Sequence, residues 1–316
     1  MKVLVTGGAG FIGSHIVRAL VDNGDQVWVI DDYSTGTPEN LDIVRSRIKM
    51  VEGDIRDPEI VGPVISEVDA VLHQGALPSV PRSFSDPVGT TSVNTGGTLN
   101  LLEAARGADI KAFVIASSSS IYGDVKASMK SEDLPPEPLS PYAVSKLAGE
   151  YYCRLYHKLY HLPTIALRYF NVFGPGQDPA SQYSAVIPKF CTAILEGRTP
   201  VIYGDGRQSR DFTYVDNVVQ ANLKSLSVPS RALGEVFNVA CGEKTDLLTT
   251  LKILGDIAGE EVSPIFEPAR PGDVRHSLAD ISKAREILGY SPEVLYPEGL
   301  RRTFRCFKEK HGMKIE

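Results

Sequence analysis

The chain has 316 residues and a formal net charge of −6, and 42% of its residues are hydrophobic and 23% charged. A single hydrophobic core stops growing at about 250–300 residues, so we expect one large domain and a second, smaller lobe. The acidic balance argues against a nucleic-acid-binding protein, the strand-sized apolar runs argue against a membrane span, and the N-terminus lacks the apolar stretch of a signal peptide, so we expect a cytoplasmic protein.

The first half of the chain alternates between short β-branched runs and stretches of helical spacing. The predicted strands are Lys2–Thr6, Gln26–Asp31, Lys49–Glu52, Ala70–His73, Lys111–Ala116, Thr164–Tyr169 and Glu235–Val239, and the predicted helices are Phe11–Asp22, Glu59–Glu67 and Thr95–Ala105. This alternation is typical of an α/β fold with a doubly wound parallel sheet, the Rossmann arrangement.

The composition of the chain changes after about residue 170, where proline and glycine become frequent and the alternation of predicted strands and helices becomes less regular. We expect residues 1–170 to form the first domain, with a return of about 216–240, and residues 171–316 to form a smaller C-terminal α/β domain. No long Ser/Gly linker separates the two, so we expect them to share a cleft.

A glycine-rich turn follows the first predicted strand. Gly7 permits a tight turn, Gly10 lets the backbone approach a pyrophosphate, and Gly13 lets the next helix lie close to the sheet. The start of that helix supplies free N–H groups and a favourable dipole for phosphates. Position between a strand and a helix is the context that a dinucleotide-binding turn requires.

An acidic residue ends the second predicted strand. Asp31 is placed to accept hydrogen bonds from ribose hydroxyls, and a carboxylate there disfavours a 2′-phosphate, so NAD is favoured over NADP. The absence of Lys and Arg between Asp31 and Gly36 agrees. Asp54 and Ile55, after the third strand, are candidates for an adenine contact, although an ordinary turn explains them equally well.

A Ser-rich segment and a Tyr/Lys pair carry the candidate chemistry. Ser117–Ser120 follow the fifth strand, and Tyr142 and Lys146 share one helical face behind Ser140 and Pro141, which suit a helix start. A tyrosine has a pKa of about 10, and a nearby ammonium and an oxidised nicotinamide would both favour its phenolate. Such a pair alone is usually a solvated surface pair, but together with the glycine turn it predicts proton transfer beside a hydride acceptor.

These motifs give the chain a resemblance to a known family, the nucleotide-sugar epimerases and dehydratases of the extended short-chain dehydrogenase/reductases. The motifs span nearly the whole chain in the order of the family: TGGAGFIGS (Thr6–Ser14), Asp31, SSSSIYG (Ser117–Gly123), PYAVSK (Pro141–Lys146), LRYFNVFGPGQ (Leu167–Gln177), GDGRQSRDFTYVDNV (Gly204–Val218) and RPGDVRHSLAD (Arg270–Asp280).

The resemblance implies that the first domain holds NAD and the second a UDP-sugar. By similarity Tyr142 is the catalytic base, Lys146 lowers its pKa, and Ser118 is the catalytic hydroxyl, with Ser117 and Ser119 as close rivals. The implied cofactor-binding residues are Gly7, Gly10, Phe11, Ile12, Gly13, Asp31, Asp32, Ser34, Thr35, Gly36, Asp54, Ile55, Gln74, Ala76, Asn94, Tyr142, Lys146 and Phe170. The implied substrate-binding residues are Pro78, Ser118, Ser119, Tyr142, Asn171, Gln177, Ala185, Arg210, Arg270, Asp273 and Ser277.

The resemblance also bears on the reaction. The family's dehydratases carry an acidic pair after the catalytic hydroxyl, and here Ser119 and Ser120 occupy those positions, so 4-epimerisation is favoured over elimination. In the implied mechanism Tyr142 takes the proton from the sugar O4, hydride passes from C4 to NAD, the 4-keto sugar rotates, and hydride returns to its other face. Asn171, Arg210 and Arg270 would hold the diphosphate during that rotation.

The motifs identify the sugar part of the substrate less clearly than the reaction. Ser277 stands where enzymes restricted to UDP-glucose and UDP-galactose often have Tyr, so we expect UDP-GlcNAc and UDP-GalNAc to be accepted, with UDP-glucose and UDP-galactose as further candidates. Pro78 departs from the family, where Gly or Lys is more usual. UDP-glucuronate 4-epimerase, 4,6-dehydratase and a non-catalytic NAD-binding protein stay as alternatives.

The helix that begins at the Tyr/Lys pair carries too much apolar surface for one face: Leu147, Tyr151, Tyr152, Leu155, Tyr156 and Leu159. By resemblance it would pair with the helix near 95–106 in a homodimer, through residues 142–160; the alternative is burial within one chain. The four cysteines and six histidines show no ligand spacing, so we expect no metal site.

Overall fold

Seven parallel strands form the central sheet of the protein, which the computed structural model describes over residues 1–178, 186–269 and 275–312. The strand order is β3-β2-β1-β4-β5-β6-β11, and every neighbouring pair is parallel. The strands are β1 (Lys2–Thr6), β2 (Gln26–Asp31), β3 (Ile48–Glu52), β4 (Ala70–His73), β5 (Ala112–Ser118), β6 (Thr164–Tyr169) and β11 (Val236–Val239). The predicted doubly wound sheet is confirmed, and its order reverses between β1 and β4, where such sheets bind ligands.

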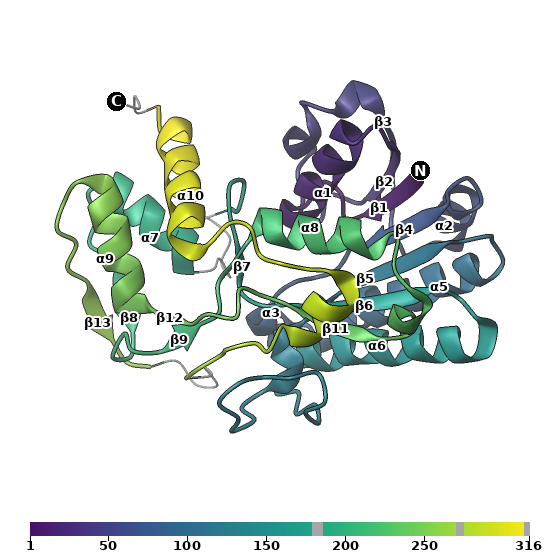
Figure 1. Ribbon diagram of the computed structural model, residues 1–316. Helices are drawn as coiled ribbons and strands as arrows, with labels where there is room; N and C mark the ends of the chain where they lie inside the picture. Colours follow the sequence, from purple (N-terminus) through teal and green to yellow (C-terminus); the bar gives the residue numbers. More distant parts are fainter. Residues whose placement is uncertain (179–185, 270–274, 313–316) are drawn as a thin grey trace.

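Helices cover both faces of the sheet (Figure 1). One face packs against α1 (Phe11–Asp22) and α8 (Val215–Ser225), and the other against α2 (Pro58–Ile65), α5 (Thr98–Arg106) and α6 (Pro141–Tyr160). Successive residues of a strand point to opposite faces, so Val3 and Val5 enter the first of these cores while Leu4 enters the second. The sheet is therefore buried on both sides, as the apolar strands predict.

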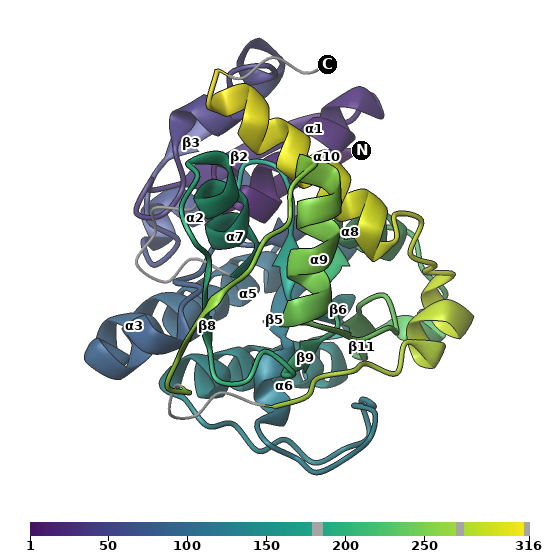
Figure 2. The same ribbon diagram turned by 90° about the vertical axis from the view of Figure 1, so that its left-hand side faces the viewer.

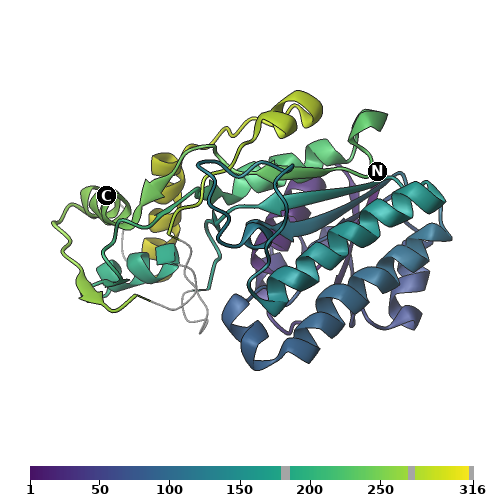
Figure 3. The ribbon, with the colours of Figure 1, turned by 90° about the horizontal axis from the view of Figure 1, so that it is seen from below.

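One helical stretch is longer than predicted. α4 (Pro87–Thr91), a π-helical turn η3 (Ser92–Gly97) and α5 follow one another, whereas the sequence indicated a helix only at Thr95–Ala105. Figure 3 shows α6 running alongside this stretch on the outside of the sheet, where it contacts α4, η3 and α5. α6 therefore begins at the predicted Tyr142/Lys146 pair and continues along the outside of the sheet.

The second lobe, which faces the viewer in Figure 2, has a core of its own. Its helices are α7 (Val186–Leu195), α9 (Leu247–Ala258) and α10 (Tyr296–Lys310), and its short strand pairs are β7 (Val172–Phe173) with β10 (Thr213–Tyr214), β8 (Val201–Tyr203) with β13 (Ile265–Glu267), and β9 (Ser209–Arg210) with β12 (Thr245–Asp246). The remaining elements are η1 (Pro38–Leu41), η2 (Arg45–Arg47), α3 (Val80–Ser85), η4 (Ser119–Tyr122), η5 (Ser230–Ala232) and η6 (Ala284–Leu288).

The chain crosses between the lobes more than once. α8 and β11 pack in the first domain, and so do Ala279, Ile281 and Tyr290. The segment 279–290 is a further return of the chain to the large domain, and the sequence does not predict it. None of the helices within the described ranges combines the length and apolar character needed to cross a membrane.

Candidate active site

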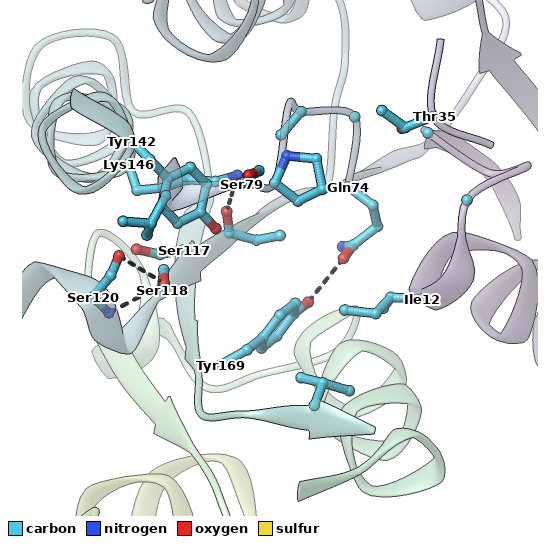
Figure 4. Close-up of a pocket in the computed structure, with 18 of the residues that line it drawn as sticks. Ile12, Thr35, Gln74, Ser79, Ser117, Ser118, Ser120, Tyr142, Lys146 and Tyr169 are labelled. Carbon is cyan, nitrogen blue, oxygen red and sulfur yellow. Dashed lines mark hydrogen bonds between the residues drawn. The ribbon is translucent and has the colours of Figure 1, made fainter. Parts of the chain in front are cut away.

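A cleft of about 1260 Å³ opens at the carboxyl ends of the parallel strands. It is lined by the residues that follow β1 to β6, by the start of α6, and by Arg210 and Ser277 of the second lobe. In Figure 4, Tyr142, Lys146 and the serines lie on one side of this cleft, and Ile12 and Thr35 lie on the opposite side. The two groups of predicted residues therefore share one cavity.

The glycine turn is built so that side chains would not fit. Gly7 has a φ of +66°, and a Cβ added there would lie 2.7 Å from the Cα of Gly75. A Cβ at Gly13 would lie 2.1 Å from the Gly7 carbonyl oxygen. α1 begins at Phe11 with no side-chain cap and no acidic residue in its first turn, so its first N–H groups are available to a diphosphate.

Asp31 is held rigidly at the end of β2. Its Oδ2 accepts a hydrogen bond from the Ala9 N–H (2.8 Å), and its Oδ1 accepts one from the Tyr33 N–H (2.9 Å). Burial raises the pKa of the carboxyl, and these two backbone bonds act against that rise. A fixed carboxylate for ribose hydroxyls and a free helix start for a diphosphate together fit NAD.

The serines that follow β5 have different partners. Ser118 Oγ accepts hydrogen bonds from the Ser120 N–H (3.1 Å) and the Ser120 hydroxyl (2.9 Å), which leaves its own proton to donate. Ser118 is the serine whose interaction lowers the pKa of Tyr142. Ser117 instead donates to Glu150 Oε1 (2.5 Å) at a buried position. Of the three candidates, Ser118 is therefore the hydroxyl that acts on Tyr142.

Tyr142 and Lys146 lie at the start of α6, behind the N-cap formed by Ser140. The Lys146 ammonium donates to the Ala116 carbonyl (2.9 Å) and lies 6.0 Å from the Tyr142 ring centroid. Burial lowers the pKa of Lys146 to about 8. Burial also raises the pKa of Tyr142, and the Ser118 hydrogen bond offsets part of this rise.

The influence of Lys146 on the Tyr142 pKa stays a prediction of the resemblance. Burial is the first cause of the raised pKa of Tyr142, and burial disfavours the phenolate. The positive charge of an oxidised nicotinamide would favour the phenolate, so we expect bound cofactor to assist proton transfer by Tyr142.

Most of the predicted cofactor-binding residues line the cleft: Gly7, Gly10, Phe11, Ile12, Gly13, Asp31, Asp32, Ser34, Thr35, Asp54, Ile55, Gln74, Ala76, Tyr142 and Lys146. Gly36, Asn94 and Phe170 are not among the lining residues. Gly36 packs on the glycine turn, where a Cβ would lie 2.6 Å from the Ala9 carbonyl carbon. Asn94 joins a loop to α6, because its Oδ1 accepts from the Leu77 N–H and its Nδ2 donates to Ser145 Oγ. Phe170 is fully buried in the first core.

The predicted substrate-binding residues are placed as follows. Pro78, Ser118, Ser119, Tyr142, Asn171, Gln177, Arg210 and Ser277 line the cleft, while Ala185, Arg270 and Asp273 lie outside the described residues. Arg210 Nη1 donates to the carbonyls of Ser209 (2.9 Å) and Arg275 (3.2 Å). Asn171 has a φ of +31°, a strained value for a non-glycine residue, at the point where the chain leaves β6.

Several polar residues that line the cleft were not predicted, and Lys130 and Tyr169 are two of them. Lys130 is buried, 3% exposed, and its ammonium donates to the Val125 carbonyl; burial lowers its pKa. Tyr169 ends β6, donates to Gln74 Oε1 (3.1 Å), and accepts from Asn222 Nδ2 (2.8 Å). The position of Tyr169 at a strand end could have indicated it. Lys130 lies in a loop without periodicity, so the sequence offers no comparable signal.

Comparisons with known proteins agree with this geometry. The profile of the NAD-dependent epimerase/dehydratase family matches residues 3–240. A UDP-glucose 4-epimerase from Mycolicibacterium smegmatis is 40% identical over 314 residues, covering 98% of this chain and 99% of that protein. A UDP-N-acetylglucosamine 4-epimerase from Methanobrevibacter ruminantium, solved with UDP-N-acetylmuramic acid, is 40% identical with a TM-score of 0.93 and 98% of each chain covered. A UDP-glucuronic acid 4-epimerase from Bacillus cereus, solved with UDP-glucuronic acid and NAD, is 37% identical with a TM-score of 0.91, covering 98% of this chain and 100% of that one.

Proposed function

The chain belongs to the NAD-dependent epimerase/dehydratase family, and we propose that it is a UDP-sugar 4-epimerase that keeps its NAD tightly bound. The observation that carries the proposal is that Ser118, Tyr142 and Lys146, the last two one helical turn apart at the start of α6, line the same cleft as the glycine turn. The three residues form a proton-transfer group beside a dinucleotide site.

Tyr142 would remove the proton from the sugar O4 and later return it. Bound NAD supplies an acceptor and then a donor of hydride at C4, so the net reaction is redox-neutral. Ser118 would donate a hydrogen bond to the same sugar oxygen and steady the charge that develops on it. Lys146 would hold the ribose next to the nicotinamide through its remaining N–H groups.

Inversion requires the 4-keto sugar to rotate while its nucleotide stays in place. Asn171 and Arg210 are the described candidates for holding the diphosphate, and both line the cleft. Arg270 and Asp273, which are outside the described residues, complete the proposed set.

The absence of an acidic pair supports epimerisation over dehydration. Ser119 and Ser120 occupy the positions at which the resemblance places the acid and base for elimination. A hydroxyl of ordinary acidity is a weak base and a weak acid, so removal of water across C5 and C6 would lack its proton-transfer groups. A non-catalytic role is disfavoured because Tyr142 and Lys146 are both retained.

For the sugar, we propose that UDP-GlcNAc and UDP-GalNAc are accepted and that UDP-glucose and UDP-galactose are further substrates. Ser277 supports this proposal because it lines the cleft and its small side chain leaves room for a 2-acetamido group. The M. ruminantium enzyme, named for UDP-N-acetylglucosamine, is among the similar structures.

UDP-glucuronate is the second candidate, because the cleft contains a buried cation. A 6-carboxylate needs an ammonium or a group of hydroxyls, and Lys130, Ser119 and Ser120 all line the same cleft. The similar B. cereus enzyme is named for this substrate.

We also propose a homodimer formed through α6. Tyr151, Leu155 and Leu159 are 56%, 45% and 55% exposed, although other residues of the same helix pack against α5 and the sheet. An exposed apolar stripe of this kind is typical of a surface that a partner covers.

The proposed function is tested by incubating the purified protein, without added NAD, with UDP-GlcNAc, UDP-glucose and UDP-glucuronate, and separating the C4 epimers. We expect turnover of at least one. Tyr142→Phe should lower turnover by about 10²–10⁴-fold while leaving bound NAD detectable, because it removes only the proton-transfer group. Tyr152→Phe, on the same helix, serves as the control. Release of a 4-keto-6-deoxy product would instead identify a dehydratase, and no turnover of any sugar would contradict the proposal.

A further inference from the structure

Three residues on one face of α6 lie against the end of β5. Tyr142, Lys146 and Glu150 are spaced four residues apart, so they lie one above another along the helix. Lys146 donates to the Ala116 carbonyl (2.9 Å) and Glu150 accepts from the Ser117 hydroxyl (2.5 Å), while the next serine, Ser118, lowers the pKa of Tyr142. The proposed mechanism uses Tyr142 and Lys146 and leaves Glu150 without a role.

Glu150 is part of a buried ion pair. Its two carboxylate oxygens accept hydrogen bonds from Nε and Nη2 of Arg168, both at 2.8 Å, and the side chains are 4% and 6% exposed. Arg168 lies on β6 directly opposite Ser117 of β5 in the sheet register. Replacing a buried pair by apolar side chains is often neutral for stability, so stability alone explains this pair weakly.

The same ion pair reaches the other end of the Ser-rich turn. The Arg168 guanidinium lies over the Tyr122 ring, 4.7 Å from its centroid. The Tyr122 hydroxyl donates to Asn238 Oδ1 of β11 (2.8 Å), so the ring is held at its face by Arg168 and at its hydroxyl by β11. Ser117 precedes the Ser118–Ile121 segment and Tyr122 follows it. One buried pair therefore holds both flanks of the segment that carries Ser118.

We propose that Glu150 and Arg168 form a brace of positioning residues, which fixes the Ser117–Tyr122 turn so that the Ser118 hydroxyl faces Tyr142. The brace acts through Ser117 on one side and through Tyr122 on the other. Glu150 and Arg168 are absent from the lining of the cleft, so they act on the reaction only through the turn. The expected effect on kcat rests on the proposed function. The expected fixing of the Ser117–Tyr122 turn does not.

The test uses variants that remove the brace without leaving a buried charge unpaired. Glu150→Met/Arg168→Met replaces the ion pair by apolar side chains. Ser117→Ala removes the hydrogen bond from Ser117 to Glu150 and leaves the ion pair intact. We expect each to lower kcat by about 10- to 100-fold with KM changed less than about 3-fold, because a small misplacement of a reacting group has effects of this size. The variant with all three substitutions should lose no more than the worse of the two, since Glu150→Met/Arg168→Met already removes the contact that Ser117→Ala removes.

Thr164→Val is the matched control. Thr164 Oγ1 donates to the Cys153 carbonyl (2.7 Å), a buried bond between the same two elements, α6 and β6, but away from the turn. This variant should lose stability and keep its kcat. Unchanged kcat in both brace variants would overturn the proposal, and multiplied losses in the triple variant would do so too, because they would show Ser117 acting directly.

Hydrogen–deuterium exchange separates this inference from the proposed function. Amides of residues 117–123 should exchange faster in Glu150→Met/Arg168→Met and in Ser117→Ala than in the wild type or in Thr164→Val. This readout needs no turnover, so it decides the matter even if no UDP-sugar of the panel reacts. Equal exchange across the segment in all four proteins would overturn the brace.

Discussion

Neighbouring residues of one type differ in function here because their backbone positions give them different partners. Both Ser117 and Ser118 line the cleft, but Ser117 donates to Glu150 of α6, whereas Ser118 is the serine that lowers the pKa of Tyr142. The resemblance favours Ser118, with Ser117 and Ser119 as rivals that residue type alone does not exclude. The choice depends on the strand alternation and on which side chain the neighbouring helix presents.

His73 is a residue whose structural role the packing makes explicit. Thr98 Oγ1 donates its one proton to the Asn94 carbonyl, so it must accept from His73 Nε2 (2.8 Å). In the neutral ring, which burial favours, Nδ1 is then the acceptor and Thr6 Oγ1, which also accepts from the Gly75 N–H, donates to it (2.6 Å). Burial, with a smaller contribution from the Lys146 charge, lowers the pKa of His73 to about 3.

This arrangement predicts loss of stability in mild acid. Between about pH 6.5 and pH 3 the unfolded chain binds a proton at residue 73 that the folded protein excludes, so the free energy of unfolding falls as the pH falls. The loss attributable to His73 should be about 2 kcal/mol between pH 7 and pH 5. Denaturant unfolding of wild type and His73→Gln at both pH values isolates it, because all other groups are common to the two proteins. Parallel pH dependences in the two proteins would refute this role.

At the scale of elements, the strands of the large domain were predicted almost to the residue, because fully buried parallel strands need continuous β-branched runs. β7, β9, β10 and β12 have only two residues each, and their pairing depends on contacts between distant segments. Nothing local specifies them. The same reason explains Lys130, which reaches the cleft from a loop whose course is fixed by the 276–280 segment beside it.

The contact between the glycine turn and α1 yields a test at this scale. Gly13→Ala would place a Cβ 2.1 Å from the Gly7 carbonyl oxygen and 2.8 Å from the Gly8 Cα, and both neighbours are backbone atoms. α1 must move away from β1, so we expect the protein to lose about 1–3 kcal/mol of stability and to release NAD. Thermal unfolding and the absorbance of co-purified cofactor measure the two effects.

Gly62→Ala is the control for that substitution. Gly62 lies within α2, and a Cβ there would meet no atom within 4 Å. Alanine is the better helix former, so this variant should gain up to about 1 kcal/mol and retain its cofactor. Retention of NAD and stability by Gly13→Ala would show that the turn does not hold the helix as tightly as its geometry indicates.

At the scale of the molecule, a large domain and a second lobe enclose one cleft. The two cores of the large domain contain residues from the first half of the chain together with α8, β11 and 279–290, so repeated crossings of the chain join the second lobe to the large domain. The part of the candidate site that the large domain contributes was predictable, because its residues belong to local sequence motifs such as the glycine turn and the Tyr/Lys pair. The contribution of the second lobe was predictable only in part, because Arg210 and Ser277 reach the cleft through the packing of distant loops.

The proposed dimer is the property of the whole molecule that α6 makes testable, because one helix carries Tyr142 at its start and the exposed stripe along its length. Leu155→Glu places a charge at the centre of that stripe, where burial in an interface would cost several times more than exposure to water. We expect the wild type to sediment as a dimer at micromolar concentration and Leu155→Glu as a monomer. Ile43→Glu introduces the same charge at an apolar residue that is 76% exposed between η1 and η2, and should leave the dimer intact. A monomeric wild type, or dissociation caused equally by both substitutions, would contradict an interface on α6.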